Sequence, residues 1–150
     1  MKPLTHYIQE KLIIKKSNNY KYFPQTKKEL KDIILQRIKT EGNEVNLNDI
    51  DVSNITDMSR LFLSTDFNGD ISNWNVSNVT DMSDMFSWCK SFNQDISNWD
   101  VSNVTDMYSM FYYCKSFNQD LSAWDVSNVK DHRFIFSNCG IQQKYKPKFK

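Results

Sequence analysis

Residues 99–104 read Trp-Asp-Val-Ser-Asn-Val, and variants of this phrase recur along most of the chain. The copies end at four positions, which are Ile55, Val79, Val104 and Val129. The later copies follow one another at intervals of 25 residues, whereas the first interval is 24 because one residue is missing between Phe62 and Phe67. Periods of about 20 to 50 residues are typical of stacked units, each too small to bury its own apolar face. The repeat therefore predicts a stack of similar turns.

Each repeat carries two different patterns of apolar residues. Trp99 and Val101 lie two positions apart, so both can face one side of a short strand. Val104, Met107 and Phe111 follow at three- and four-residue spacing, which predicts a short helix. We therefore expect an α/β, leucine-rich-repeat-like solenoid of about four 25-residue turns, each a short strand plus a short helix. Its expected core comprises Met82, Phe86, Phe92, Ile96, Trp99, Val101, Val104, Met107 and Phe111.

A helix is expected before the repeats, over roughly residues 27–41. Thr26 and Glu29 form a capping box, and Gly42 is a typical stop. Apolar residues recur at helical spacing, namely Leu30, Ile33, Ile34 and Ile38. The basic polar face is compatible with binding to a membrane surface. An open solenoid needs its first turn covered, however, so we predict an N-terminal helical cap.

These patterns divide the 150 residues into four segments. Residues 1–25 form an N-terminal segment whose structure is left open, and residues 26–48 hold the capping helix and the approach to the first strand. The solenoid repeats span 49–139, and 140–150 is a basic C-terminal tail. In the last copy Lys130 replaces Thr and His132 replaces Met, so that core positions become polar where a stack should end.

Charge is segregated along the chain, although the net charge is only +1. Residues 1–41 carry ten Lys/Arg against four acids, 42–139 carry five against fourteen, and 140–150 carry four against none. We expect the basic ends to solvate the chain and neutralise the acidic repeats; binding of anionic surfaces or nucleic acid through these ends is a distant alternative. The sequence has neither an apolar run of membrane-spanning length nor signal-peptide features, which favours cytoplasmic synthesis without a membrane span.

Three cysteines, Cys89, Cys114 and Cys139, share one repeat position. Parallel side chains in a stack suit a column of buried thiols better than a disulfide, and no Cys/His pairing suggests a metal. The aspartates also form columns, which we interpret as structural caps and turn residues rather than a calcium site. His6 and His132 have no nucleophilic partner in a recognisable motif. We therefore predict no catalytic residues, no metal and no cofactor.

The copies disagree at a few positions, and these are the best indication of a binding surface. One such column reads Ser59, Ser83, Tyr108 and Arg133; a second reads Ser87, Tyr112 and Ser137; a third reads Trp88, Tyr113 and Asn138. Aromatic residues and Arg outside the core pattern are typical binding anchors. The hypothesis is a protein-binding patch of Trp88, Tyr108, Tyr112, Tyr113 and Arg133. The simpler alternative is that these rings pad the flank or meet the terminal tail.

The run from Val104 to Val129, with Asp106-Met107, Met110-Phe111 and Phe117-Asn118, resembles the BspA-type leucine-rich repeats catalogued as DUF285 and first noted in mycoplasma lipoproteins. The resemblance covers about residues 49–139. It implies a solenoid that binds proteins, often at bacterial surfaces, without catalytic activity. This chain is similar to short members that lack an export signal or anchor, including proteins of phages and giant viruses.

The leading function is therefore a non-catalytic module that binds a protein partner, with no small-molecule substrate. The alternative is a self-associating structural or virion-associated protein, since stacked edges and separated charges favour head-to-tail contacts. The localisation and the identity of the partner stay open at this stage.

Overall fold

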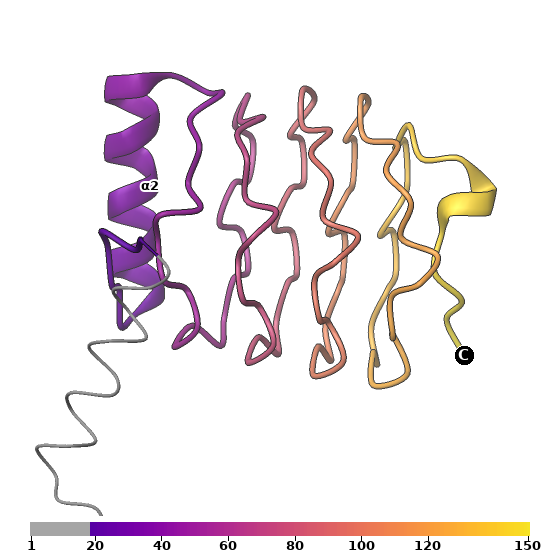
Figure 1. Cartoon of the computed structure of the whole chain (residues 1–150). Coiled ribbons are helices and arrows are strands. Elements are labelled where there is room, and N and C mark those ends of the chain that lie inside the picture. The colour runs from indigo at the N-terminus through magenta and orange to yellow at the C-terminus, as the bar shows by residue number, and fades with distance from the viewer. Residues whose placement is uncertain (1–18) are drawn as a thin grey trace, which may run out of the picture.

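The structure is a computed structural model that describes residues 19–150. Residues 1–18, which belong to the segment left open above, lie outside the described residues. Helix α2 spans Lys27–Glu41, and the 3₁₀ turn η1 spans Gln143–Tyr145. Between them the repeats follow as successive loops side by side, with α2 at one end of the stack and the C-terminus at the other (Figure 1).

The prediction of an α/β solenoid with a strand and a helix in each turn is wrong. Within residues 19–150 no strand forms, and the repeats contain no helix. Neighbouring repeats are joined by isolated parallel bridges instead, which link Asp57 to Asp81, Asp81 to Asp106, and Asp106 to Asp131. The four segments that follow these bridges, residues 57–64, 81–88, 106–113 and 131–138, are called the turn segments below.

Left-handed residues explain why the turn segments are not helices. Each segment holds two residues with φ between 52° and 63°, and none of them is Gly. They are Arg60, Ser64, Asp84, Trp88, Ser109, Tyr113, Phe134 and Asn138. A left-handed residue interrupts a right-handed helix. The backbone therefore makes successive tight turns, in which the N–H of Met110 donates to the carbonyl of Met107 at 3.2 Å and that of Tyr112 to Ser109 at 3.1 Å.

Alternate N–H groups of the first three turn segments join each of them to the next repeat. The N–H groups of Met107, Ser109, Phe111 and Tyr113 donate to carbonyls of the last turn segment at 2.8–3.0 Å. The same alternation occurs at the two earlier joints, again toward the next repeat in the sequence. Just before the turn segments, the N–H groups of Thr80, Thr105 and Lys130 donate back to the preceding repeat at 2.8 Å. Three joints therefore share one bonding pattern.

The predicted core is confirmed, since all nine residues named above are buried. Equivalent rings stack on one another through the repeats: Phe86 lies between Phe62 and Phe111, with ring centroids 5.4 and 5.6 Å away. The indole N–H of Trp99 donates to the carbonyl of Ile71 in the preceding repeat at 3.2 Å. Apolar stacking and satisfied polar groups thus hold the repeats together where the strands were expected.

The predicted N-terminal helix is confirmed with its bounds. The Thr26 hydroxyl accepts the N–H of Glu29, and Gly42 ends the helix with φ of 91°. The Glu29 carboxylate accepts the N–H of Gln25 rather than that of Thr26, so the capping box is shifted by one residue. Leu30 and Ile34 are buried against the core, as a helix covering the first repeat requires.

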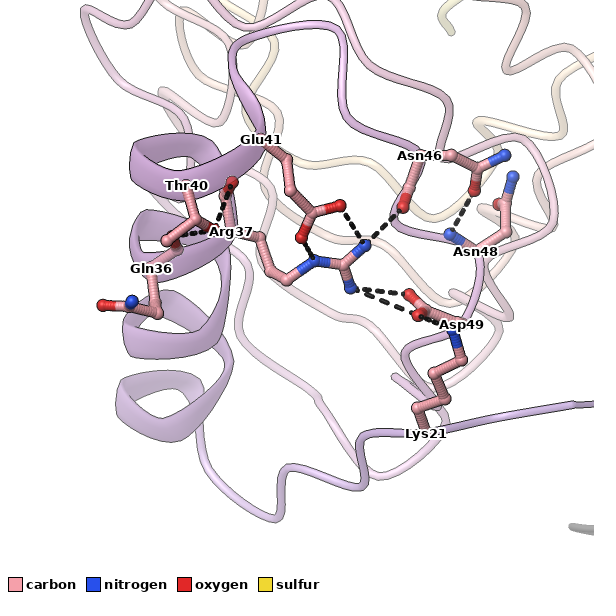
Figure 2. A network of polar contacts seen from close by, with 8 residues as sticks. All are labelled: Lys21, Gln36, Arg37, Thr40, Glu41, Asn46, Asn48 and Asp49. Carbon is pink, nitrogen blue, oxygen red and sulfur yellow. Dashed lines mark hydrogen bonds and ion pairs between the residues drawn. The ribbon is translucent and has the colours of Figure 1, made fainter.

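Polar contacts fix α2 to the chain that leads into the repeats (Figure 2). The Arg37 guanidinium donates to both carboxylate oxygens of Asp49, at 2.9 and 3.2 Å, to the Asn46 carbonyl and to Glu41. Lys27 is paired with the Asp57 carboxylate at 3.1 Å. Two of the basic residues on the polar face of the helix therefore bind the protein itself.

The basic tail packs on the last repeat. Ile141 and Pro147 are buried, and the N–H of Leu121 donates to the carbonyl of Tyr145 at 2.8 Å. The Phe149 ring stacks on His132 with centroids 4.2 Å apart. His132 is thus a partly buried residue at the end of the stack, where a Met occupies the core in earlier repeats.

Candidate functional site

Three aromatic residues of the predicted patch form one cluster on the second and third turn segments. The rings of Trp88 and Tyr113 are stacked, with centroids 4.2 Å apart and planes 8° apart. Tyr112 meets both edge-on, at 6.0 Å from Trp88 and 4.8 Å from Tyr113. Edge-on and offset contacts of this kind stabilise aromatic clusters beyond the area that they bury.

Trp88 and Tyr113 stack because they occupy the same left-handed position of consecutive turn segments. Ser64 and Asn138 hold that position in the outer repeats, so the column has rings only at its centre. The ammonium group of Lys90 lies 5.7 Å from the Trp88 ring, and that of Lys115 lies 4.9 Å from the Tyr113 ring. The cluster is thus flanked by cations.

The other two predicted residues form a second group. The Arg133 guanidinium lies 5.5 Å above the Tyr108 ring and is paired with the Asp131 carboxylate at 2.6 Å. That hydrogen-bonded pair lowers the pKa of Asp131 to about 2. Phe134 meets Tyr108 edge-on at 5.9 Å. Tyr108 therefore lies between a cation and a further ring that sequence reasoning did not include.

A groove of about 500 Å³ runs across the turn segments between these groups. Its lining includes Trp88, Tyr108 and Tyr112 from the predicted patch, whereas Tyr113 and Arg133 only contact lining residues. The remaining lining residues are Arg60, Leu63, Asp84, Ser87, Ser109 and Phe134. Arg60 and Asp84 form an ion pair at 3.5 Å, which places one charged pair among the rings.

Exposure identifies this groove as unusual. Five large apolar residues are exposed in the described part of the chain, and three of them, Leu63, Trp88 and Phe134, line the groove. Phe134 is the most exposed, at 57%. Single exposed apolar residues are common, whereas clusters of them around a groove are typical of interaction surfaces.

Sequence reasoning missed both Phe134 and Leu63, although variation between the repeats could have indicated Phe134. The left-handed column that contains Phe134 reads Arg60, Asp84, Ser109 and Phe134, so it varies in chemistry as much as the three columns used above. Its first three members are polar, and Phe134 is the only ring in the column.

The column of buried thiols predicted from the cysteine spacing is confirmed for Cys89 and Cys114, whereas Cys139 is only partly buried. The Cys89 thiol donates to the Phe62 carbonyl and the Cys114 thiol to the Phe86 carbonyl, both at 2.8 Å, and all three cysteines are free. Burial raises the pKa of the Cys89 thiol to about 11 and raises that of Cys114 further. These thiols stay protonated at neutral pH.

The aspartate columns close turns of the backbone. The Asp106 carboxylate accepts the N–H of Tyr108 at 2.8 Å, two residues further on, and Asp120 accepts both the hydroxyl and the N–H of Ser122. The bonds from Ser122 hold the pKa of Asp120 below its usual value. The carboxylates after Thr were expected at helix N-termini; because no helix forms there, they close Asx turns instead.

Calcium removal is expected to leave the melting temperature unchanged, because these carboxylates already accept bonds from their own turns. In the described residues no group of His, Cys, Asp and Glu is placed to hold a metal ion. Calorimetric melting in excess calcium and in excess EDTA, at constant ionic strength, tests this expectation. A melting temperature several degrees lower in EDTA would contradict it.

Among residues 19–150, no helix is both long enough and apolar enough to cross a lipid bilayer.

Residues 29–148 match the family described as "Mycoplasma protein of unknown function, DUF285". No curated protein matches the chain, and neither does any solved structure. The match begins inside α2 and ends in the tail, so it includes every turn segment and the whole groove lining. The chain belongs to the DUF285 family.

Proposed function

We propose that the chain is a non-catalytic protein-interaction module whose partner binds in the aromatic groove. The observation that carries this proposal is the gathering of Leu63, Trp88 and Phe134 around one groove, together with Tyr108 and Tyr112. Aromatic residues supply much of the binding energy at protein interfaces, with single anchors contributing about 2 kcal/mol or more. The Arg60–Asp84 pair offers the polar contacts that orient a partner.

A non-catalytic role fits the chemistry of the lining. The described lining residues offer hydroxyls and one carboxylate but no imidazole or thiol. His132 lies outside the groove under the Phe149 ring, and the cysteines are held as buried thiols with raised pKa values. The arrangement thus favours recognition over nucleophilic or acid–base chemistry.

The alternatives receive less support from the contacts. Head-to-tail self-association needs both ends accessible, but α2 packs on the first repeat. Binding of an anionic surface needs free cations, whereas Lys27 and Arg37 of α2 are paired with Asp57 and Asp49. In the groove itself, one Arg is balanced by one Asp. A heterotypic protein partner is therefore the preferred proposal.

A variant that exchanges residues between repeats tests the proposal with little risk to the fold. Replacing Tyr108, Tyr112 and Phe134 by Ser copies residues that other repeats hold at the same positions, namely Ser83, Ser87 and Ser109. We expect this triple variant to fold and to bind the partner at least tenfold more weakly, because three anchors are removed. Thermal melting checks the fold.

The measurement compares wild type, triple variant and a Leu35→Gln control as immobilised baits in a cell extract. Leu35 is 48% exposed on α2, away from the groove lining, so the control changes an exposed apolar residue elsewhere. Captured proteins are identified and then titrated by calorimetry against each variant. The proposal predicts proteins that bind wild type and Leu35→Gln alike but lose affinity for the triple variant. Equal affinities for all three baits would refute it.

A further inference from the structure

The last turn segment leaves a row of backbone N–H groups without acceptors. In the preceding segment, alternate N–H groups donate to the next repeat at 2.8–3.0 Å. The equivalent groups of the last segment belong to His132, Phe134, Phe136 and Asn138, and none of them has a hydrogen-bond acceptor among residues 19–150. Strand edges with such unpaired rows are templates for pairing with another chain.

The direction of the joints makes this row electropositive. At all three joints alternate N–H groups of a turn segment, such as those of Met107 and Ser109, point toward the C-terminal end of the stack, and the carbonyls they meet point back. Aligned peptide dipoles leave partial positive charge where the N–H groups are unpaired. In this segment Arg133 is paired with Asp131, so the excess of positive charge comes from the adjoining tail, which has four lysines and no acid.

The tail covers this end only in part. Phe149 stacks on the His132 ring, and the Lys146 ammonium lies 5.7 Å from the Phe136 ring. No described tail residue accepts a hydrogen bond from the four N–H groups. The tail therefore shields side chains while the backbone edge stays unpaired.

A second copy of the chain is a poor match for the edge. Its complementary row would be the carbonyls of Asp57, Ser59, Leu61 and Leu63, which also have no donor in the described part of the chain. However, α2 packs beside that row, with Lys27 bonded to the Asp57 carboxylate and to the Ser59 hydroxyl. Pairing two copies would require this helix to move.

We propose that residues 131–138 form a docking edge for a repeat turn of the same kind, presented by a different, acidic protein. The three joints inside this chain show the main-chain bonds that such a turn would reproduce once the Phe149 and Lys146 side chains move off the His132 and Phe136 rings. Charge supports this occupant, because repeats of this type are acidic: residues 42–139 carry fourteen acids against five Lys/Arg. The mode is edge pairing, in which main-chain bonds supply affinity. Docking at this edge does not depend on the aromatic groove.

The experiment follows individual amides of the full-length, ¹⁵N-labelled chain by hydrogen exchange. The probe is a synthetic peptide of residues 79–95 carrying Cys89→Ser, which has three acids against one Lys and whose carbonyls at 81, 83, 85 and 87 accept N–H groups of the preceding repeat. A scrambled peptide of equal composition is the control. In the free protein we expect the amides of 132, 134, 136 and 138 to exchange far faster than their equivalents at 107, 109, 111 and 113.

Addition of the probe should protect these four amides at least tenfold and leave those of Ile135 and Ser137 unchanged, because the latter already donate within their own segment. Protection of the four amides in the free monomer, or equal effects of probe and scrambled peptide, would overturn the proposal.

Light scattering on the free protein adds a third outcome: self-assembly that protects the same four amides would replace the acidic partner by a second copy. A double variant with Tyr108→Ser and Tyr112→Ser leaves residues 131–138 unchanged. It should therefore still bind the probe even if the groove proposal fails.

Discussion

Replacement of Trp99 by Ala is expected to lower the free energy of unfolding by about 3–5 kcal/mol, the usual cost of removing a large buried ring. Trp99 is only 4% exposed, and its ring lies parallel to that of Trp74 at 6.5 Å. The substitution opens a cavity and also leaves the Ile71 carbonyl without the indole N–H that it accepts. In a chain of this size such a loss is a large part of the total stability.

Urea unfolding followed by circular dichroism measures the effect of Trp99→Ala. The matched control is Trp88→Asn, which removes an indole that is 41% exposed and introduces the residue found at the same position in the last repeat. The control is expected to change stability by less than about 1 kcal/mol, since it creates no buried cavity. A similar loss of unfolding free energy in the two variants would contradict the prediction, because it would mean that a buried indole stabilises the fold no more than an exposed one.

Gly69→Ala is expected to destabilise the chain by about 3 kcal/mol, at the upper end of the range for overpacked sites. A Cβ at this position would lie 1.9 Å from the Val45 carbonyl oxygen and 2.7 Å from the Phe67 ring. The carbonyl belongs to the backbone that joins α2 to the repeats, so it cannot move aside as a flexible side chain would. Thermal and urea unfolding of the purified variant measure the loss.

The control for Gly69→Ala is Gln94→Ala, at the same position of the next repeat. The Gln94 side chain reaches the Asn68 amide oxygen at 3.2 Å, which shows that this position has room for a side chain once a full repeat precedes it. Gln94→Ala should cost less than about 1 kcal/mol, because only one partly exposed hydrogen bond is lost. If Gly69→Ala were as mild as its control, the close approach of the Val45 backbone would not constrain the first repeat.

Much of the architecture could be predicted because it depends on periodicity and local signals. The bounds of α2 follow from Thr26 and Gly42, and the core residues follow from the recurrence of the same apolar positions. The interior of each turn could not be predicted in the same way. Consecutive tight turns place apolar residues such as Val104, Met107 and Phe111 at three- and four-residue spacing, which is also the spacing of a helix.

The residues that distinguish consecutive tight turns from a helix carry no clear signal in the sequence. Left-handed φ values are usually associated with Gly or Asn, yet Trp88, Ser109 and Phe134 adopt them here. Hydrogen bonds between repeats impose these conformations, and such bonds form only after the repeats have stacked. The same effect limited the prediction of the site. Column variation found Trp88 and Tyr108, whereas the exposure of Leu63 and Phe134 depends on turns that were expected to be helical.

The uniform joints have a consequence for how this chain can change in length. A tandem duplication of residues 80–104 would insert a unit that meets both neighbours through the same donors and acceptors, with α2 and the tail untouched. Each added unit would extend the surface by about 4.8 Å, the spacing of backbones joined by hydrogen bonds. Recombination can therefore set the length of the proposed binding surface in fixed steps, while point substitutions along it alter the chemistry of each repeat.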